Sequence, residues 1–390
     1  MQFPDRIKNI GLSKIVEVSE KIKLMKEKLG GEFIYFQRGI VGLPTYEGIM
    51  HGLIEAFEKG LTKYPKSGGE PWFKQSVKNY LEDRGIRVNE KNVLAVYGGQ
   101  EGLQLSFSLF EGRKCLTFQP CWSCVLENIF PYNRIHVLFT NLNENFEIDF
   151  SNLEKKLKEV DVLYLNSPHN PTGKVFSEEE LEKINYLCKK HNIFIISDEA
   201  YNEIIYDGKK HNSMLQFDNP NLIASFSFSK MFAATGLRLG FIVCRNKDII
   251  GALNKAEYTQ TAGVYSVGQY AIAKALNDKE NREKWFNNLR KELEKRRNLM
   301  YEELSKFINT YKPEGAFYFF INLNKYIKEN VKNKDEFLLR KFLEERVAII
   351  PGSAFGKDYS GYIRISFSTA NEKEIKEGIS RIRKVIEKLN

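Results

Sequence analysis

Lys230 and Arg238 are the residues of this chain whose types and spacing point most directly to a chemistry. Lys230 follows the hydroxyl residues Ser227 and Ser229, and Arg238 comes eight positions after the lysine. A lysine amine can form a Schiff base with an aldehyde, and a guanidinium can bind a phosphate through two parallel hydrogen bonds. Pyridoxal 5′-phosphate (PLP) carries both groups, so the pair predicts a PLP site. Lysine and arginine are abundant here, and the prediction therefore depends on the other parts of such a site.

A glycine turn at 97–102 could bind the phosphate. It follows the apolar run 93–96 and precedes a helical pattern. The backbone N–H groups at the start of a helix are free to bind an anion, which makes Gly99 and Gln100 candidate phosphate ligands. A simple strand-to-helix turn would have the same composition.

Four residues that follow predicted strands could hold the ring of the cofactor. Trp122 can stack on a pyridine ring, and Asn170 and Tyr201 can donate to its phenolic oxygen. Asp198 follows the apolar run 193–197 at the carboxyl edge of the predicted sheet, where it can keep the pyridine nitrogen protonated. Each has a structural alternative, such as a core tryptophan, a proline turn at Asn170 or a helix N-cap at Asp198.

Arg364 stands inside an alternating apolar strand at 362–367. Burying a guanidinium there is costly unless an anion binds it. A substrate α-carboxylate would be a bidentate partner, and a structural salt bridge is the alternative.

Together these motifs resemble the class I/II PLP-dependent aminotransferases of fold type I, the group of aspartate and aromatic aminotransferases. The resemblance extends from about residue 39 to the C-terminus, and its most specific parts are 170–173, 198–201, 229–238 and Arg364. It implies an enzyme that uses PLP to move an amino group between an L-amino acid and a 2-oxo acid, with 2-oxoglutarate as acceptor. A PLP-dependent lyase or synthase on the same scaffold would share every cofactor residue and stays an alternative.

The resemblance also implies a role for each candidate residue. The catalytic groups would be Lys230, Asp198 and Tyr201. The cofactor ring would be bound by Trp122, Asn170, Asp198 and Tyr201. Its phosphate would be bound by Gly99, Gln100, Ser227, Ser229 and Arg238. The substrate would be bound by Trp122, Asn170, Gly42 and Arg364, with the Gly42 backbone and Arg364 at the carboxylate.

Tyr64 is similar to the family's tyrosine that reaches the phosphate of the neighbouring subunit, so the resemblance implies a homodimer with shared active sites. Family members often have cis bonds before the prolines that match Pro120 and Pro171. The donor could be aspartate or an aromatic or apolar amino acid. The helix predicted at 101–110 has no lysine or arginine, and the N-terminal segment that lines the mouth in the family has Ile15 and Val16, which favours an apolar donor. An arginine from elsewhere, such as Arg38, would favour aspartate.

Seven strand signals alternate with helical patterns and predict an α/β fold with a mostly parallel seven-stranded sheet. They lie near 93–97, 114–118, 135–139, 162–165, 193–197, 222–227 and 239–244. A capping box at 177–180 predicts a helix through about residue 190. Long charged helices after 280 predict a smaller α+β domain. We therefore divide the chain into a PLP-binding domain at 46–280 and a small domain at 281–390, with the segment 1–45, including a helix from Ser13 to Lys28, packing on the small domain.

Composition excludes several other classes. The chain has 390 residues, which suggests two lobes, and no apolar run long enough to span a membrane. Residues 1–8 have no apolar core of a signal peptide, which predicts a cytoplasmic protein. The net charge of +9 comes from basic residues interleaved with acids along helices, so we expect no nucleic-acid partner.

The five cysteines include a CxxC pair, Cys121 and Cys124. A zinc site would need a second pair or histidines at ligand spacing, and neither is present, so no metal is predicted. A redox role for the pair is an open but weak alternative to two small residues beside Trp122.

Overall fold

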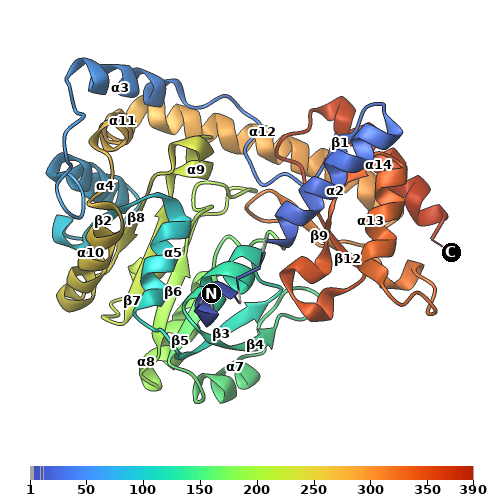
Figure 1. Cartoon of the computed structure of the whole chain (residues 1–390), viewed down its shortest axis with the longest axis horizontal. Helices are drawn as coiled ribbons and strands as arrows, with labels where there is room; N and C mark the ends of the chain where they lie inside the picture. The colour runs from blue at the N-terminus through green and yellow to red at the C-terminus, as the bar shows by residue number, and fades with distance from the viewer. Residues whose placement is uncertain (1–3, 9, 12, 390) are drawn as a thin grey trace.

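One seven-stranded sheet organises the larger lobe of the computed structural model, which describes residues 4–8, 10–11 and 13–389 (Figure 1). Its strands run in the order β2-β8-β7-β6-β5-β3-β4, and β8 is antiparallel to both neighbours whereas the other pairs are parallel. The bounds are β2 (Val93–Val96), β3 (Lys114–Gln119), β4 (His136–Asn141), β5 (Val162–Asn166), β6 (Phe194–Asp198), β7 (Leu222–Ser227) and β8 (Gly240–Val243). The predicted α/β class and mostly parallel seven-stranded sheet are confirmed.

The strands are apolar because helices cover both faces of the sheet. Every residue of β2, β5 and β7 is buried, as expected for strands covered on both sides. The helices of this lobe are α3 (Glu47–Glu58), α4 (Pro71–Asp83), α5 (Gly98–Ser108), α6 (Phe130–Tyr132), α7 (Phe150–Leu157), α8 (Glu178–Lys190), α9 (Phe228–Met231), α10 (Lys247–Thr261) and α11 (Ser266–Asn277). The predicted capping box opens α8: the Ser177 hydroxyl accepts from Glu180 N at 3.2 Å, and the Glu180 carboxylate accepts from Ser177 N at 2.9 Å.

The smaller lobe combines both ends of the chain. A three-stranded antiparallel sheet contains β9 (Tyr318–Asn322), β11 (Ile350–Pro351) and β12 (Tyr362–Ser366). The short strand β1 (Ile34–Tyr35) pairs in parallel with β10 (Val347–Ala348). The N-terminal helix α2 (Lys14–Leu29) lies against α13 (Lys334–Glu344), and α14 (Glu372–Glu387) covers this lobe as well (Figure 1). A further helix, α1 (Asp5–Lys8), precedes α2.

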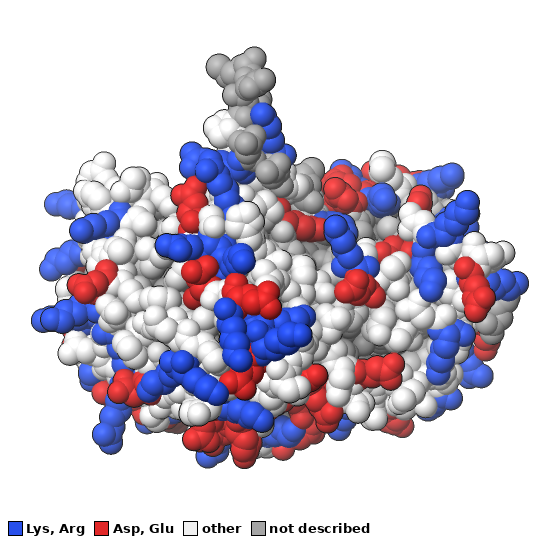
Figure 2. Space-filling view, turned by 90° about the horizontal axis from the view of Figure 1, so that it is seen from below, with Lys and Arg blue, Asp and Glu red and all other residues white. Residues whose placement is uncertain are grey.

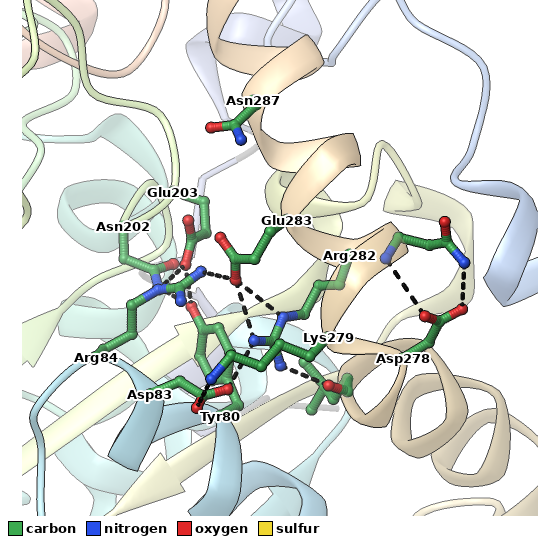
Figure 3. A network of polar contacts seen from close by, with 12 residues as sticks. Tyr80, Asp83, Arg84, Asn202, Glu203, Asp278, Lys279, Arg282, Glu283 and Asn287 are labelled. Carbon is green, nitrogen blue, oxygen red and sulfur yellow. Dashed lines mark hydrogen bonds and ion pairs between the residues drawn. The ribbon is translucent and has the colours of Figure 1, made fainter.

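The long helix α12 (Lys279–Ser305) joins the two lobes (Figure 1). A network of ion pairs fixes its first half to the large lobe (Figure 3). Arg282 of α12 contacts Asp83 of α4 at 2.8 Å, and Arg290 contacts Glu203 at 3.0 Å. The second half packs on α14.

Charges of both signs are interspersed on the surface. Figure 2 shows one face, on which lysine and arginine side chains alternate with acidic ones. Among the described residues, no helix is long and apolar enough to cross a membrane, and no cluster of three side chains could hold a metal ion. Residues 1–3 of the segment considered as a possible signal peptide lie outside the described residues.

Candidate active site

A cavity of about 290 Å³ lies at the carboxyl ends of β5, β6 and β7, beside the start of α5. Ligands bind at this edge of parallel sheets. The cavity collects all of the candidate residues except Tyr64 and Gly42. Its lining is Ile15, Gly39, Ile40, Gly99, Gln100, Leu103, Trp122, Asn166, Asn170, Asp198, Ala200, Tyr201, Ser227, Ser229, Lys230, Thr235, Arg238, Tyr318 and Arg364.

Lys230 enters the cavity from α9, the short helix after β7. Ser227 caps this helix, since its hydroxyl accepts from Ser229 N at 3.3 Å. The amine of Lys230 donates to the carbonyl of Gly39. Burial, together with the charges of Arg238 and Arg364, lowers the pKa of Lys230 to about 8. The amine is therefore neutral and nucleophilic far more often near neutral pH than an exposed lysine would be.

Asp198 is the last residue of β6 and is fully enclosed. Its carboxylate accepts from the Tyr164 hydroxyl at 2.9 Å and from Ala200 N at 3.2 Å. Burial raises its pKa to about 6, against the lowering effect of these two donors. A turn, not a helix, follows Asp198, so the alternative role as a helix N-cap is excluded. A cationic partner in the cavity would stabilise this buried charge.

The start of α5 and Arg238 form a cradle for an anion. Gly98 has a φ of +81°, and a Cβ atom there would lie 3.0 Å from the Arg238 guanidinium. A Cβ on Gly99 would lie 3.3 Å from Ser227, so only glycines keep this space open. Backbone N–H groups, two serine hydroxyls and a guanidinium face one another here, which is the donor set that a phosphate requires. The residues present therefore fit the phosphate of PLP.

Arg364 is 1% exposed and lies on β12 at the small-lobe side of the cavity. It donates to the Asn170 side-chain oxygen and to the Gln37 carbonyl, both at 3.1 Å. Its Nε atom is buried without a partner, and within the described part of the chain no carboxylate pairs with it. Among the described residues, Arg364 therefore makes no structural salt bridge. A buried guanidinium with a free N–H is suited to a carboxylate that arrives with a ligand.

Asn170 is held in place by the end of the neighbouring strand. Asn166, the last residue of β5, accepts from Asn170 N at 2.8 Å and donates to the Asp198 carbonyl at 3.0 Å. The bonds before Pro120 and Pro171 are cis, as the resemblance implies, and the bond before Pro168 is also cis.

The sequence model of the family described as Aminotransferase class I and II matches residues 43–382. The chain belongs to this family. An aspartate aminotransferase of Pyrococcus abyssi is 34% identical over 358 residues, which cover 89% of this chain and 90% of that protein. An aromatic-amino-acid aminotransferase 2 of Thermococcus litoralis is 32% identical over 360 residues, with the same coverage of 89% and 90%. The solved aspartate aminotransferase of Thermus thermophilus with maleate shares the fold, with a TM-score of 0.90 at 24% identity over 99% of this chain and 100% of that chain.

As a class I/II aminotransferase, the protein is an enzyme that uses PLP. The family match identifies it as an aminotransferase, whereas the residues alone left a lyase or synthase open.

Two candidate residues of this aminotransferase, Gly42 and Tyr64, do not line the cavity. The Gly42 N–H donates to the Ser368 carbonyl at 3.1 Å, and the residue does not line the cavity. Gly39 lines it instead. Both glycines belong to the run at 39–44, and sequence alone does not distinguish them. Tyr64 is 91% exposed on the large lobe and lies outside the cavity of its own chain, where a residue predicted to reach the site of a neighbouring subunit would be found.

The sequence-based interpretation missed Tyr318, which lines the cavity from β9. Its hydroxyl lies 3.0 Å from that of Tyr201, and the Arg364 guanidinium lies 4.3 Å from the centre of its ring. The run at 315–321 has a purely apolar and aromatic pattern, so a core strand was the natural prediction.

The CxxC pair lies beside the site, and its thiols are in an environment that disfavours the reactive thiolate form. Cys121 and Cys124 are free and buried. Burial raises the pKa of both thiols to about 12. Since the thiolate is the reactive form, this environment argues against a redox role.

Proposed function

We propose that the protein transfers the amino group of an L-amino acid, aromatic or apolar in preference to aspartate, to a 2-oxo acid such as 2-oxoglutarate. The observation that carries the proposal is the convergence of Lys230, Asp198 and Arg364 on one cavity. An amine of lowered pKa, a buried acid and an unpaired buried guanidinium are the groups that transamination of an amino acid needs.

Each residue contributes a separate function in this proposal. When bound, PLP supplies an aldehyde carbon for the amino group and an electron-poor ring that withdraws electrons from the substrate. Asp198 keeps the pyridine nitrogen protonated, and Trp122 stacks on the ring. Asn170 and Tyr201 donate to the phenolic oxygen. The phosphate is bound by Gly99, Gln100, Ser227, Ser229 and Arg238.

Arg364 and Lys230 act on the substrate. Arg364 binds the α-carboxylate and orients the Cα–H bond toward Lys230. The amine of Lys230 would remove the Cα proton of the substrate as a general base and return it as a general acid. One keto acid would leave, and a second keto acid would then accept the amino group.

The lining of the cavity supports an apolar or aromatic donor. Ile15, Ile40 and Leu103 are its aliphatic side chains. The cations among the described lining residues are Lys230, Arg238 and Arg364, all of which have a role in the proposal. Arg38 is exposed and stacks on Tyr35 at 4.3 Å, outside the cavity, so it supplies no charge to a substrate side chain.

We further propose a homodimer. Met50, Ile54 and Phe57 form an exposed apolar stripe on α3, at a spacing that places them on one face of the helix. Tyr64 follows this helix and is 91% exposed. A stripe of this kind supports burial against a second copy, and Tyr64 would then reach the partner's phosphate site.

A half-reaction screen tests the substrate class. Each amino acid is added to the PLP-loaded protein without a keto acid, and the visible spectrum is followed as the cofactor gains the amino group. We expect phenylalanine, tyrosine and leucine to react faster than aspartate, and 2-oxoglutarate to restore the starting spectrum. If aspartate alone reacts, the proposed side-chain preference is wrong. If no amino acid reacts, the proposed function is wrong.

A further inference from the structure

Tyr318 reaches the cavity beside Arg364, from the small lobe. Antiparallel pairing of β9 and β12 places Tyr318 opposite Ser366 and Phe320 opposite Arg364, so Tyr318 and Arg364 are diagonal neighbours on one face of this sheet. The Arg364 guanidinium lies 4.3 Å from the centre of the Tyr318 ring. The Tyr318 hydroxyl is 3.0 Å from the hydroxyl of Tyr201, which belongs to the large lobe.

The number of protons in this pair limits what each hydroxyl can do. A phenol has one proton to donate and can also accept. Among the described residues, the hydroxyl of Tyr201 is hydrogen-bonded only to Tyr318. If the hydroxyl of Tyr201 donates its hydrogen bond to the phenolic oxygen of the cofactor, it can only accept from Tyr318. The hydrogen bond between the two tyrosines then persists only if Tyr318 is the donor.

The local charges favour this direction. Burial raises the pKa of Tyr201 well above its usual range, and it also raises the pKa of Tyr318. The Arg364 charge opposes the rise at both hydroxyls, and the Asp198 charge adds to it at Tyr201. The charged groups that face the pair are Arg364 from β12, Asp198 from β6 and Lys230 from α9. The positive guanidinium lies over the ring of Tyr318, so Tyr318 is the better donor of the two.

We propose that Tyr318 is a positioning residue that donates a hydrogen bond to the Tyr201 hydroxyl. This bond strengthens the hydrogen bond from Tyr201 to the phenolic oxygen of PLP. This inference rests on the proposed function of Tyr201. Hydrogen bonds in a chain polarise one another in a buried site, so the first donor strengthens the second.

The strengthened bond has a measurable effect on the bound cofactor. A donor to the phenolic oxygen withdraws electron density and lowers the proton affinity of the linkage between PLP and Lys230. Without Tyr318 as donor, protonation of this linkage, which changes the visible absorption, should occur at higher pH. We expect a rise of about half a pKa unit for Tyr318→Phe, because a weakened hydrogen bond is worth a fraction of the 1.36 kcal/mol per unit.

The experiment is a spectroscopic pH titration of the PLP-loaded protein and four variants. Tyr318→Phe, Tyr201→Phe and the double variant form a cycle that isolates the coupling between the two hydroxyls. The matched control is Tyr206→Phe. Tyr206 is also fully buried, donates its hydroxyl to the Ala316 carbonyl and carries an arginine over its ring at 4.7 Å, but it lies outside the cavity.

The expected result is a large upward shift for Tyr201→Phe, a smaller one for Tyr318→Phe and none for Tyr206→Phe. In the Tyr201→Phe background, Tyr318→Phe should have no further effect. An unshifted Tyr318→Phe variant, or an equal shift in both backgrounds, would overturn the inference while leaving the role of Tyr201 intact. An unshifted Tyr201→Phe variant would instead refute the proposed function of that residue.

Discussion

The amine of Lys230 is buried beside two guanidinium groups, and this environment sets the pH at which it can react with an aldehyde. We predict that the rate of PLP attachment to the apoprotein rises with pH through about 8 and then levels off, because only the neutral amine attacks. Absorbance follows the attachment, and borohydride reduction should fix PLP on Lys230. Lys174→Arg, a change at another buried lysine, is the control and should leave trapping unchanged. An adduct on a different lysine would contradict the assignment.

The raised pKa of Asp198 makes a prediction about the apoprotein. In the folded protein the pKa of Asp198 is about 6, above its ordinary value of 3.8, so folding favours the protonated carboxyl. The stability that the protonated group contributes is fully present below pH 4 and is lost as the pH rises through 6. Asp198→Asn should therefore stabilise the apoprotein above pH 6, by up to about 3 kcal/mol for two pKa units, with no gain below pH 4. Denaturant unfolding at several pH values measures this. In the PLP-loaded enzyme the same variant should lose several kcal/mol of transition-state stabilisation. Near-normal turnover would rule out the pyridine role.

Because the Nε–H of Arg364 has no partner, we expect replacement of this residue to impair the reaction of substrates that carry a carboxylate. A lysine cannot reproduce the two-pronged contact of a guanidinium, so Arg364→Lys should lower kcat/KM for amino and keto acids by about 2 to 3 kcal/mol, or roughly 30- to 150-fold. PLP affinity and Tm should change little, and slow reactions of amines without a carboxylate should be unaffected. Steady-state kinetics and thermal unfolding provide these values. An equal loss for such amines would mean that the arginine is structural.

At the scale of elements, a buried carboxylate anchors the helix that links the lobes. Glu203 is 4% exposed and accepts from the Tyr80 hydroxyl at 2.5 Å and from Arg84 at 2.9 Å (Figure 3). It also accepts from Arg290 of α12 at 3.0 Å. Tyr80→Phe removes one donor from this buried charge and should cost about 1 to 3 kcal/mol of unfolding free energy. The control Tyr270→Phe removes a similar bond to the more exposed Glu55 and should cost less. Equal losses in denaturant unfolding would contradict the anchoring role.

The sequence predicted the strands well because most are short apolar runs, and β5, β6 and β7 each end at a polar residue. Asp198 and Ser227 could be placed at the site for this reason, since parallel strands bring their carboxyl ends to one edge. The antiparallel direction of β8 was not predictable, because it depends on the path of the connections and not on the strand's own residues. Tyr318 and Gly39 were not predicted as cavity residues. Their position in the lining depends on how the two lobes pack together, and no local sequence pattern indicates this.

At the scale of the whole molecule, the proposed role of Tyr64 in the partner's site leads us to expect complementation between two variant chains. In a dimer with shared sites, Lys230→Ala and Tyr64→Phe chains should form heterodimers in which both lesions fall in one site and the other site is native. Mixing after partial unfolding should therefore restore activity relative to the Lys230→Ala homodimer and improve PLP affinity relative to the Tyr64→Phe homodimer. A mixture of Lys230→Ala with Lys230→Arg chains is the control and should stay inactive. A fully active monomer in sedimentation would refute the shared site.

The pairing of β1 with β10 has a consequence for the synthesis of the protein. Ile34 and Tyr35 leave the ribosome about three hundred residues before their partners Val347 and Ala348. Lys230, Asp198 and the turn at 97–102, which we propose to bind the phosphate, all precede that point. The nascent chain therefore acquires the groups that we propose to bind the cofactor before it acquires Arg364, which we propose to bind the substrate.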